Sequence, residues 1–142
     1  MNNGDMLNAA KNYLASNASL RDALGISAAT VLEPQCLGEG EHNQNFWFED
    51  ASSGRRFVLR INVLPQPFHE NQIAYESNVL KLIEPCGCAP RPLYLDDSEG
   101  ALGCGVMVES FCEGRQLDFD NLQEGDLQKA AQLMADYHSV DV

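Results

Sequence analysis

Two glycines separated by one residue, Gly38 and Gly40, lie in the stretch CLGEGEHNQNFWFE, between an apolar lead-in and an aromatic run. Glycine lets a backbone approach a bulky anion closely, and its N–H groups can then donate to phosphate oxygens. Polar residues follow at once, among them His42 and Asn43. The stretch suits a phosphate-binding loop, but on these residues alone an ordinary hairpin turn explains it equally well.

A cation and a carboxylate are predicted to meet on partly buried surface. Strand alternation in residues 55–62 places Arg60 on the same face as Val58. In residues 68–84, apolar residues lie three before, four after and seven after Glu76, so this carboxylate lies within the apolar stripe of a helix. Burial is costly for an unpaired carboxylate, so we expect Arg60 to pair with Glu76. The alternative is that Glu76 lies at the rim of the stripe and Arg60 is solvated.

Hydrophobic periodicity and turn residues predict the elements that must position these side chains. In chain order they are a helix at 5–24 broken near Asn17, strands at 30–37, 46–49 and 55–62, a helix at 68–84, strands at 93–96 and 105–111, and a helix at 122–138. Short hairpins require antiparallel neighbours. We therefore expect an α+β fold: a five-stranded antiparallel sheet with the Glu76 helix packed on it and the N-terminal helix outside.

The charge balance excludes several classes of partner. The chain has 9 Lys and Arg against 21 Asp and Glu, a net charge of −12. No basic cluster interrupts this acidity, so nucleic acid and anionic membranes are poor partners. Neither a leader-like start nor an apolar run of roughly 18 residues is present, and we predict a cytoplasmic chain.

The five cysteines contain no C-x-x-C pair, the spacing typical of zinc sites. We therefore predict no metal site and expect reduced, mostly buried thiols. Cys86 and Cys88 flank a single glycine, which is the one spacing that suits a redox-active pair.

Five segments in order resemble the amino-terminal lobe of protein-kinase-like phosphotransferases. They are LGEGEHNQNFWF, FVLRIN, YESNVLKLI, APRPLYLD and GVMVESFCEG. Within that superfamily they look closest to the aminoglycoside phosphotransferase and choline kinase group. The later segment AAQLMADYHSV resembles the helix that opens the carboxy-terminal lobe there. The resemblance covers about residues 30–140 and implies ATP as cofactor, together with Mg²⁺.

The resemblance implies roles for the glycine stretch and the ion pair. Gly38 and Gly40 would let the hairpin cover the triphosphate, with Asn43 or His42 near the phosphates. Arg60 stands where the family usually has the lysine that contacts the α- and β-phosphates, and Glu76 would orient it. Arginine keeps the charge and adds a fork that suits phosphate oxygens, so the departure changes geometry more than electrostatics.

GVMVESFCEG resembles the hinge between lobes, where the adenine edge pairs with backbone. By position, the carbonyl of Glu109 and the N–H of Phe111 would make those contacts. Leu37 and Val58 would form apolar walls above the ring, with Val108 at the back of the pocket. On the sequence alone, an ordinary buried strand explains this segment as well.

The family's catalytic loop, an H-x-D with an Asn about five residues on, is missing from the sequence. No catalytic residue is therefore assigned, and the Mg²⁺ ligands are expected from a missing lobe. Asp118 and Asp120 are predicted to be linker residues, because they follow the hinge directly. The resemblance divides the chain into an N-terminal helical segment (1–28), an ATP-binding lobe with hinge (29–112), and a linker with the first helix of a truncated second lobe (113–142).

The sequence alone is compatible with two functions. The first is the ATP-binding lobe of a kinase that phosphorylates a hydroxyl of an unidentified small molecule, inactive as this chain alone. The alternative is a non-catalytic binding or regulatory module that self-associates. The apolar face of the last helix, between Leu127 and Tyr137, motivates this second hypothesis.

Overall fold

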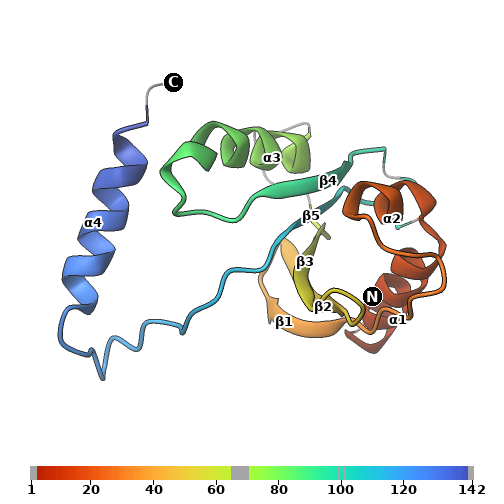
Figure 1. The fold of residues 1–142 in the computed structure, drawn as a ribbon, viewed down its shortest axis with the longest axis horizontal. Helices are drawn as coiled ribbons and strands as arrows, with labels where there is room; N and C mark the ends of the chain where they lie inside the picture. Colours follow the sequence, from red (N-terminus) through yellow and green to blue (C-terminus); the bar gives the residue numbers. More distant parts are fainter. Residues whose placement is uncertain (1–2, 65–70, 99, 101, 141–142) are drawn as a thin grey trace.

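The computed structural model of the chain describes residues 3–64, 71–98, 100 and 102–140. In chain order its elements are α1 (Asn3–Ser16), α2 (Ala18–Leu24), β1 (Gln35–Glu39), β2 (Asn43–Asp50), β3 (Arg55–Asn62), α3 (Gln72–Ile83), the 3₁₀ turn η1 (Glu84–Cys86), β4 (Pro92–Asp96), β5 (Val106–Ser110) and α4 (Asp126–His138). The five strands form one antiparallel sheet in the order β1-β2-β3-β5-β4 (Figure 1). The predicted α+β fold with a five-stranded antiparallel sheet is confirmed.

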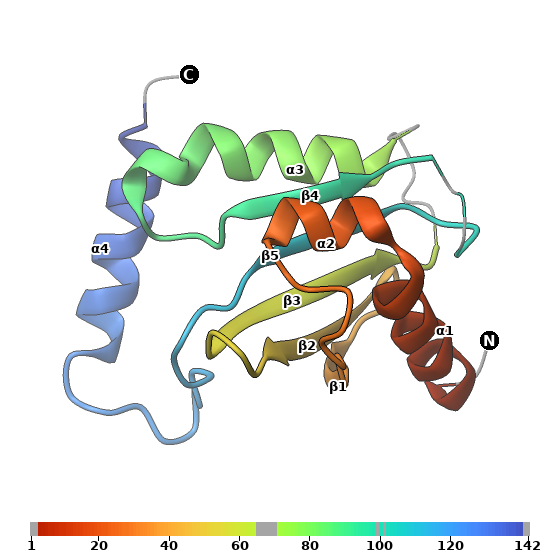
Figure 2. The same ribbon diagram turned by 45° about the vertical axis from the view of Figure 1, so that its right-hand side comes forward.

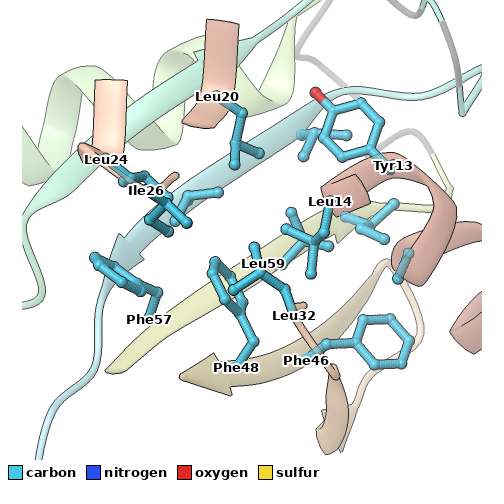
Figure 3. Packing of buried hydrophobic residues seen from close by; sticks show 14 of the residues in the cluster. Tyr13, Leu14, Leu20, Leu24, Ile26, Leu32, Phe46, Phe48, Phe57 and Leu59 are labelled. Carbon is cyan, nitrogen blue, oxygen red and sulfur yellow. The ribbon is translucent and has the colours of Figure 1, made fainter. Parts of the chain in front are cut away.

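The N-terminal helices complete the hydrophobic core. Residues of α1 and α2 such as Leu14 and Leu20 are fully buried against Phe48 and Leu59 of the sheet, and Figure 3 shows their side chains facing one another. The N-terminal helices therefore flank the sheet, as expected, and pack against its apolar face. One face of a sheet with alternating apolar residues must be covered, and these two helices cover it.

The break between α1 and α2 occurs where it was predicted, at Asn17. The Asn17 side chain accepts a hydrogen bond of 2.9 Å from the N–H of Leu20 and so begins α2. Gly25 ends α2 in the left-handed conformation, with φ at 64°. The interruption lets two short helices follow the twisted sheet.

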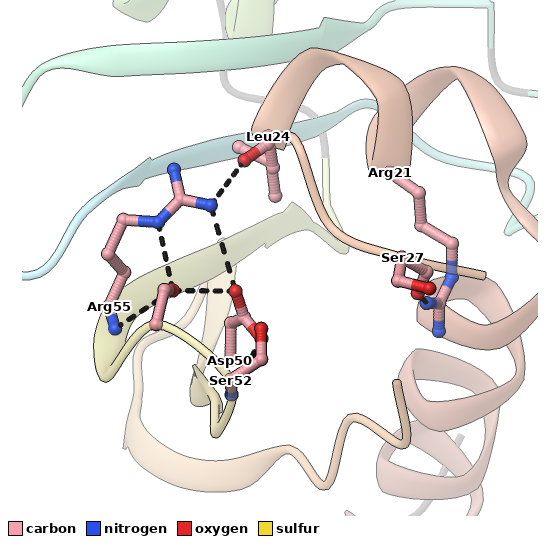
Figure 4. A network of polar contacts seen from close by, with 7 residues as sticks. Arg21, Leu24, Ser27, Asp50, Ser52 and Arg55 are labelled. Carbon is pink, nitrogen blue, oxygen red and sulfur yellow. Dashed lines mark hydrogen bonds and ion pairs between the residues drawn. The ribbon is translucent and has the colours of Figure 1, made fainter. Parts of the chain in front are cut away.

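Hydrogen bonds from two arginines connect these helices to the segments around them (Figure 4). The guanidinium of Arg21 donates to the carbonyls of Leu14, Ser27 and Thr30 at 2.7 to 3.2 Å. Arg55, in β3, donates to the carbonyl of Leu24 at 2.8 Å. These bonds satisfy backbone carbonyls in the last turn of α1 and at or just beyond the end of α2, which would otherwise lack donors.

Several element boundaries differ from the predicted ones. β1 begins at Gln35 rather than residue 30, because Pro34 cannot donate to a strand ladder and Leu32 is buried in the core as irregular chain. β2 begins at Asn43 rather than residue 46, so only residues 40–42 separate it from β1.

The two later helices also begin later than expected. α3 is capped by Asn71, whose side chain accepts from Ala74 N at 3.1 Å; the predicted start at residue 68 lies outside the described residues. α4 begins at Asp126 rather than residue 122, because the Asp126 carboxylate accepts from Gln123 N at 2.8 Å and closes a turn there.

α3 lies alongside β4 and contacts β5, on the side of the sheet away from the hydrophobic core (Figure 2). Gly105, just before β5, allows this approach, because a Cβ there would lie 2.5 Å from Cγ2 of Ile73. Beyond β5, residues 111–125 form neither helix nor strand and lead to α4, which stands apart from the sheet in both views. Among the described helices, none is long and apolar enough to span a membrane.

The cysteines differ from the prediction of reduced, mostly buried thiols. Cys86 and Cys88 form a disulfide at the end of α3. Gly87 between them adopts φ of 64°, and this turn brings the two Cα atoms to 5.4 Å. Of the remaining thiols, Cys36 and Cys112 are exposed and Cys104 is partly buried.

Candidate functional site

The predicted ion pair between β3 and α3 is present. Arg60 Nε lies 2.6 Å from Glu76 Oε2, and the two side chains are 27% and 20% exposed. Gln72, one turn earlier on α3, donates from Nε2 to Glu76 Oε1 at 2.8 Å. Both carboxylate oxygens of Glu76 are therefore engaged, which holds the guanidinium in one orientation.

Asn43 restrains the same guanidinium from β2. In the amide orientation that satisfies its hydrogen bonds, the Asn43 oxygen accepts from Arg60 Nη2 at 2.9 Å and its nitrogen donates to Asn62 Oδ1 at 2.5 Å. The other N–H groups of Arg60 have no partner within the described residues. The buried Nδ2 of Asn62 also lacks an acceptor there. Several donors thus lie side by side with no acceptor from the protein, which suits an oxyanion.

The two glycines lie beside these donors. Gly38 pairs with Asn45 in the β1–β2 ladder, and Asn45 pairs with Arg60 in the β2–β3 ladder. The N–H of Gly40 donates to the carbonyl of Asn43 at 2.8 Å and closes the turn.

Neither glycine is required by the conformation or packing of the described chain. Both have φ outside the left-handed region. A Cβ at Gly38 would meet nothing within 4 Å, and one at Gly40 would lie 3.7 Å from its nearest neighbour, the carbonyl of Asn43. The space beside Gly38 is open and a Cβ at Gly40 would make only an ordinary van der Waals contact, so a ligand could approach the backbone of both.

A pocket of about 350 Å³ opens between α3, β3 and β5. Arg60 and Glu76 lie in its wall, and the other lining residues are Tyr75, Val79, Leu80, Pro90, Met107 and Glu109. Its volume is at the lower end of the range for small-molecule sites, and its wall combines apolar surface with a few charged groups. It offers apolar surface next to an oriented cation.

Three apolar residues that were assigned to this region have different surroundings. Val58 is buried on the Arg60 face, whereas Leu37 is 48% exposed at the irregularity between Cys36 and Gly38. Val108 pairs with Leu59 and is buried in the core on the opposite face, so its predicted position at the back of the pocket is wrong. Met107, its neighbour in β5, lines the pocket instead.

The predicted backbone contacts of the hinge are both engaged within the sheet. The N–H of Phe111 donates to the carbonyl of Arg56 at 3.3 Å. This bond makes Arg56 and Phe111 a hydrogen-bonded pair, and alternation along the ladder makes Val58 and Glu109 another. The Glu109 carbonyl therefore faces β3, which corrects the assignment of these two groups. The N–H of Cys112, one residue further on, has no acceptor among the described residues.

The side chain of Glu109, rather than its carbonyl, reaches the pocket. Burial raises the pKa of its carboxyl, the Arg60 guanidinium opposes this shift, and the Glu76 carboxylate adds to it.

Sequence reasoning missed most of the pocket wall. Val79 and Leu80 follow Glu76 by three and four residues, so helical spacing could have found them. Met107 could be found only from the register of β5 against β3. Within the described residues, no three His, Cys, Asp or Glu side chains converge as metal ligands would.

Comparison with known proteins places the chain in a family. A family model described as the phosphotransferase enzyme family matches residues 35–142, well over half of the chain. No curated protein and no solved structure matches it. The matched range begins at β1 and contains the glycine turn, the Arg60–Glu76 pair and the pocket, so the predicted resemblance to the amino-terminal lobe of kinase-like phosphotransferases is confirmed. The chain belongs to the phosphotransferase enzyme family.

Proposed function

We propose that the chain is the ATP-binding lobe of an ATP-dependent phosphotransferase that acts on a hydroxyl of a small molecule. One observation carries the proposal: Arg60 is oriented by Glu76 and Asn43 beside two glycines whose conformation and packing do not require glycine. Phosphoryl transfer depends on positioned cations and backbone N–H groups at the phosphates. The family supports phosphotransferase chemistry in general, and ATP as the donor is our inference.

The residues of this lobe would hold the two ends of ATP differently. Arg60 and the Asn62 amide would donate to phosphate oxygens, with the backbone of Gly38 and Gly40 close by. At the other end, Val58 and Met107 would contact the purine, and Leu37 would cover it from β1. We revise the hinge contact to the N–H of Cys112, because that group has no acceptor among the described residues. Bound ATP would supply the phosphoryl group that is transferred.

We further propose that binding and catalysis are divided between this lobe and another. The sequence has no H-x-D segment to orient an acceptor hydroxyl, and the described residues include no cluster of metal ligands. Mg²⁺ and the small-molecule acceptor would be held by groups outside this lobe. A cytoplasmic location, where ATP is supplied, is part of the same proposal.

Titration calorimetry with ATP and Mg²⁺ tests nucleotide binding. Arg60→Met removes a charged donor, and we expect affinity to fall roughly 10- to 100-fold. Lys11→Met is the matched control, because it removes the same charge from α1, where Lys11 forms an exposed pair with Glu33.

Glu76→Gln provides a milder second variant, since it keeps the Arg60 cation but removes its charged partner. We expect a smaller loss of affinity than for Arg60→Met. Thermal melts report whether each variant folds. Unchanged ATP affinity in folded Arg60→Met would overturn the proposal.

Turnover tests the division between lobes. We expect the 142-residue chain to bind ATP and release no phosphate. Steady hydrolysis that depends on Arg60 would show that the chain carries its own catalytic groups and would contradict this division.

The exposed face of α4 supports a second candidate function, a non-catalytic module that self-associates. Leu127 is 60% exposed, Leu133 50% and Met134 61%. Sedimentation at several concentrations would show a dimer that Met134→Glu abolishes. A monomer at every concentration would count against this function.

A further inference from the structure

Glu109 places a carboxylate in the pocket without a donor to satisfy it. Its side chain lines the pocket, and among the described residues it interacts with Arg60 and Glu76 through charge alone, without a hydrogen bond or salt bridge. Arg60 acts on it electrostatically, but the hydrogen bonds of this guanidinium go to Glu76 and Asn43, and none goes to Glu109. A carboxylate removed from water without a partner is costly. A ligand that fills this pocket must therefore bring an N–H donor to Glu109.

The sheet register places Glu109 at the end of the pocket away from the glycine turn. Gly38, Asn45 and Arg60 form one row across the strands, and Trp47, Val58 and Glu109 form the row two residues further from the turn. Diagonal neighbours of this kind are about 7–8 Å apart. A ligand with its phosphates at Arg60 would thus direct its base toward Glu109 and on to Cys112.

Adenine and guanine differ in the group that they present at position 6 of the purine. Adenine carries an amino group with two N–H donors, whereas guanine carries a carbonyl oxygen that only accepts. A carboxylate opposite the amino group gains a charge-assisted hydrogen bond. A carboxylate opposite the carbonyl leaves two acceptors facing each other, and both lose hydration without gaining a bond.

We propose that Glu109 determines nucleotide specificity: its carboxylate accepts a hydrogen bond from the 6-amino group of adenine and rejects the 6-oxo group of guanine. The second N–H of the amino group stays available for a backbone carbonyl. This inference rests on the proposed function, because it requires a purine nucleotide in the pocket. Glu109 would thus select the base through its side chain, at a site where otherwise only backbone groups would pair with the base edge.

Dissociation constants for ATP and for GTP, each with Mg²⁺, test the inference. We expect the wild-type chain to bind ATP at least about tenfold more tightly than GTP. Glu109→Gln keeps the shape of the side chain, but its amide can turn either oxygen or nitrogen toward the base. The ratio of the two dissociation constants should then fall to within about threefold, which is about 0.65 kcal/mol.

Glu33→Gln is the matched control. It removes one negative charge from an exposed pair with Lys11, away from the pocket, and should leave the ratio unchanged. GTP binding that is tighter than ATP binding in the wild type would overturn the inference, since guanine would then be using its N–H edge. A ratio that Glu109→Gln does not move would also overturn it. In both cases binding that depends on Arg60 would leave the proposed function standing, whereas no binding of either nucleotide would overturn both.

Discussion

The two faces of the sheet use the same strands for opposite purposes. On the face covered by α1 and α2, five apolar residues of β3 and β5 are at most 3% exposed; they are Phe57, Leu59, Ile61, Val106 and Val108. On the opposite face, the intervening residues include Arg60 and Glu109, and a pocket opens beside them. Because strand residues alternate between faces, one short sequence encodes both the core and the site.

The faces also differ in how their polar groups are satisfied. On the core side, the Tyr13 hydroxyl donates to Asp96 at 2.7 Å, and the buried Arg21 bonds three carbonyls. On the Arg60 face of the sheet, buried polar atoms of Asn45 and Asn62 lack partners within the described residues. Buried polar groups without partners next to Arg60 suit a ligand on that face.

The largest test of this contrast is to create a cavity on the core face. Leu59→Ala should lower the free energy of unfolding by about 2–5 kcal/mol, because Leu59 is fully buried between the sheet and the N-terminal helices. Urea unfolding measures this loss. Leu37→Ala, at a half-exposed residue of β1, should cost less than about 1 kcal/mol. Equal losses in the two variants would refute the assignment of the core.

A smaller effect is expected where α3 approaches the sheet. Gly105→Ala would place a Cβ against Ile73 and should cost about 1–3 kcal/mol in unfolding free energy. It should also weaken ATP binding, since α3 carries Glu76. In a double-mutant cycle, Ile73→Ala should relieve part of the cost. Strictly additive losses would show that the contact does not limit the position of α3.

The smallest effect is a difference in pH dependence between Asp50 and Glu109. The hydroxyls of Ser52 and Ser53 lower the pKa of Asp50, so this residue stabilises the fold above its ordinary pKa of 3.8 and loses that effect as the pH falls. Burial raises the pKa of Glu109 above its ordinary value of 4.5. Its contribution to folding stability is therefore present below pH 4.5 and is lost as the pH rises through the raised pKa.

Unfolding free energies across this pH range measure both effects. Relative to the wild type, Glu109→Gln should gain stability as the pH rises above 4.5, and Asp50→Asn should lose stability as the pH rises from below 3.8. The charged and titratable groups around Glu109 are Arg60, Glu76, Tyr75 and Cys112. Parallel pH profiles for the two variants would contradict the assigned shifts.

Much of the ion-pair site could be predicted before the fold was known. A carboxylate within an apolar helical stripe and an arginine on an alternating strand predicted the Arg60–Glu76 pair, because burial makes each require a partner. The backbone hinge contacts could not be predicted in the same way. A shift of one residue exchanges the faces of β5, and this is why Val108 was assigned to the pocket in place of Met107.

By itself, the amino-acid sequence determined the elements and their alternation, since hydrophobic periodicity and turn residues act over a few neighbours. It therefore specified the glycine turn, the break at Asn17 and the charged pair. Only the tertiary structure decided that α1 and α2 close the core face and that Glu109 directs its side chain, not its carbonyl, into the pocket. Those outcomes depend on strand register and on which surfaces pack together, and such contacts join residues far apart in the chain.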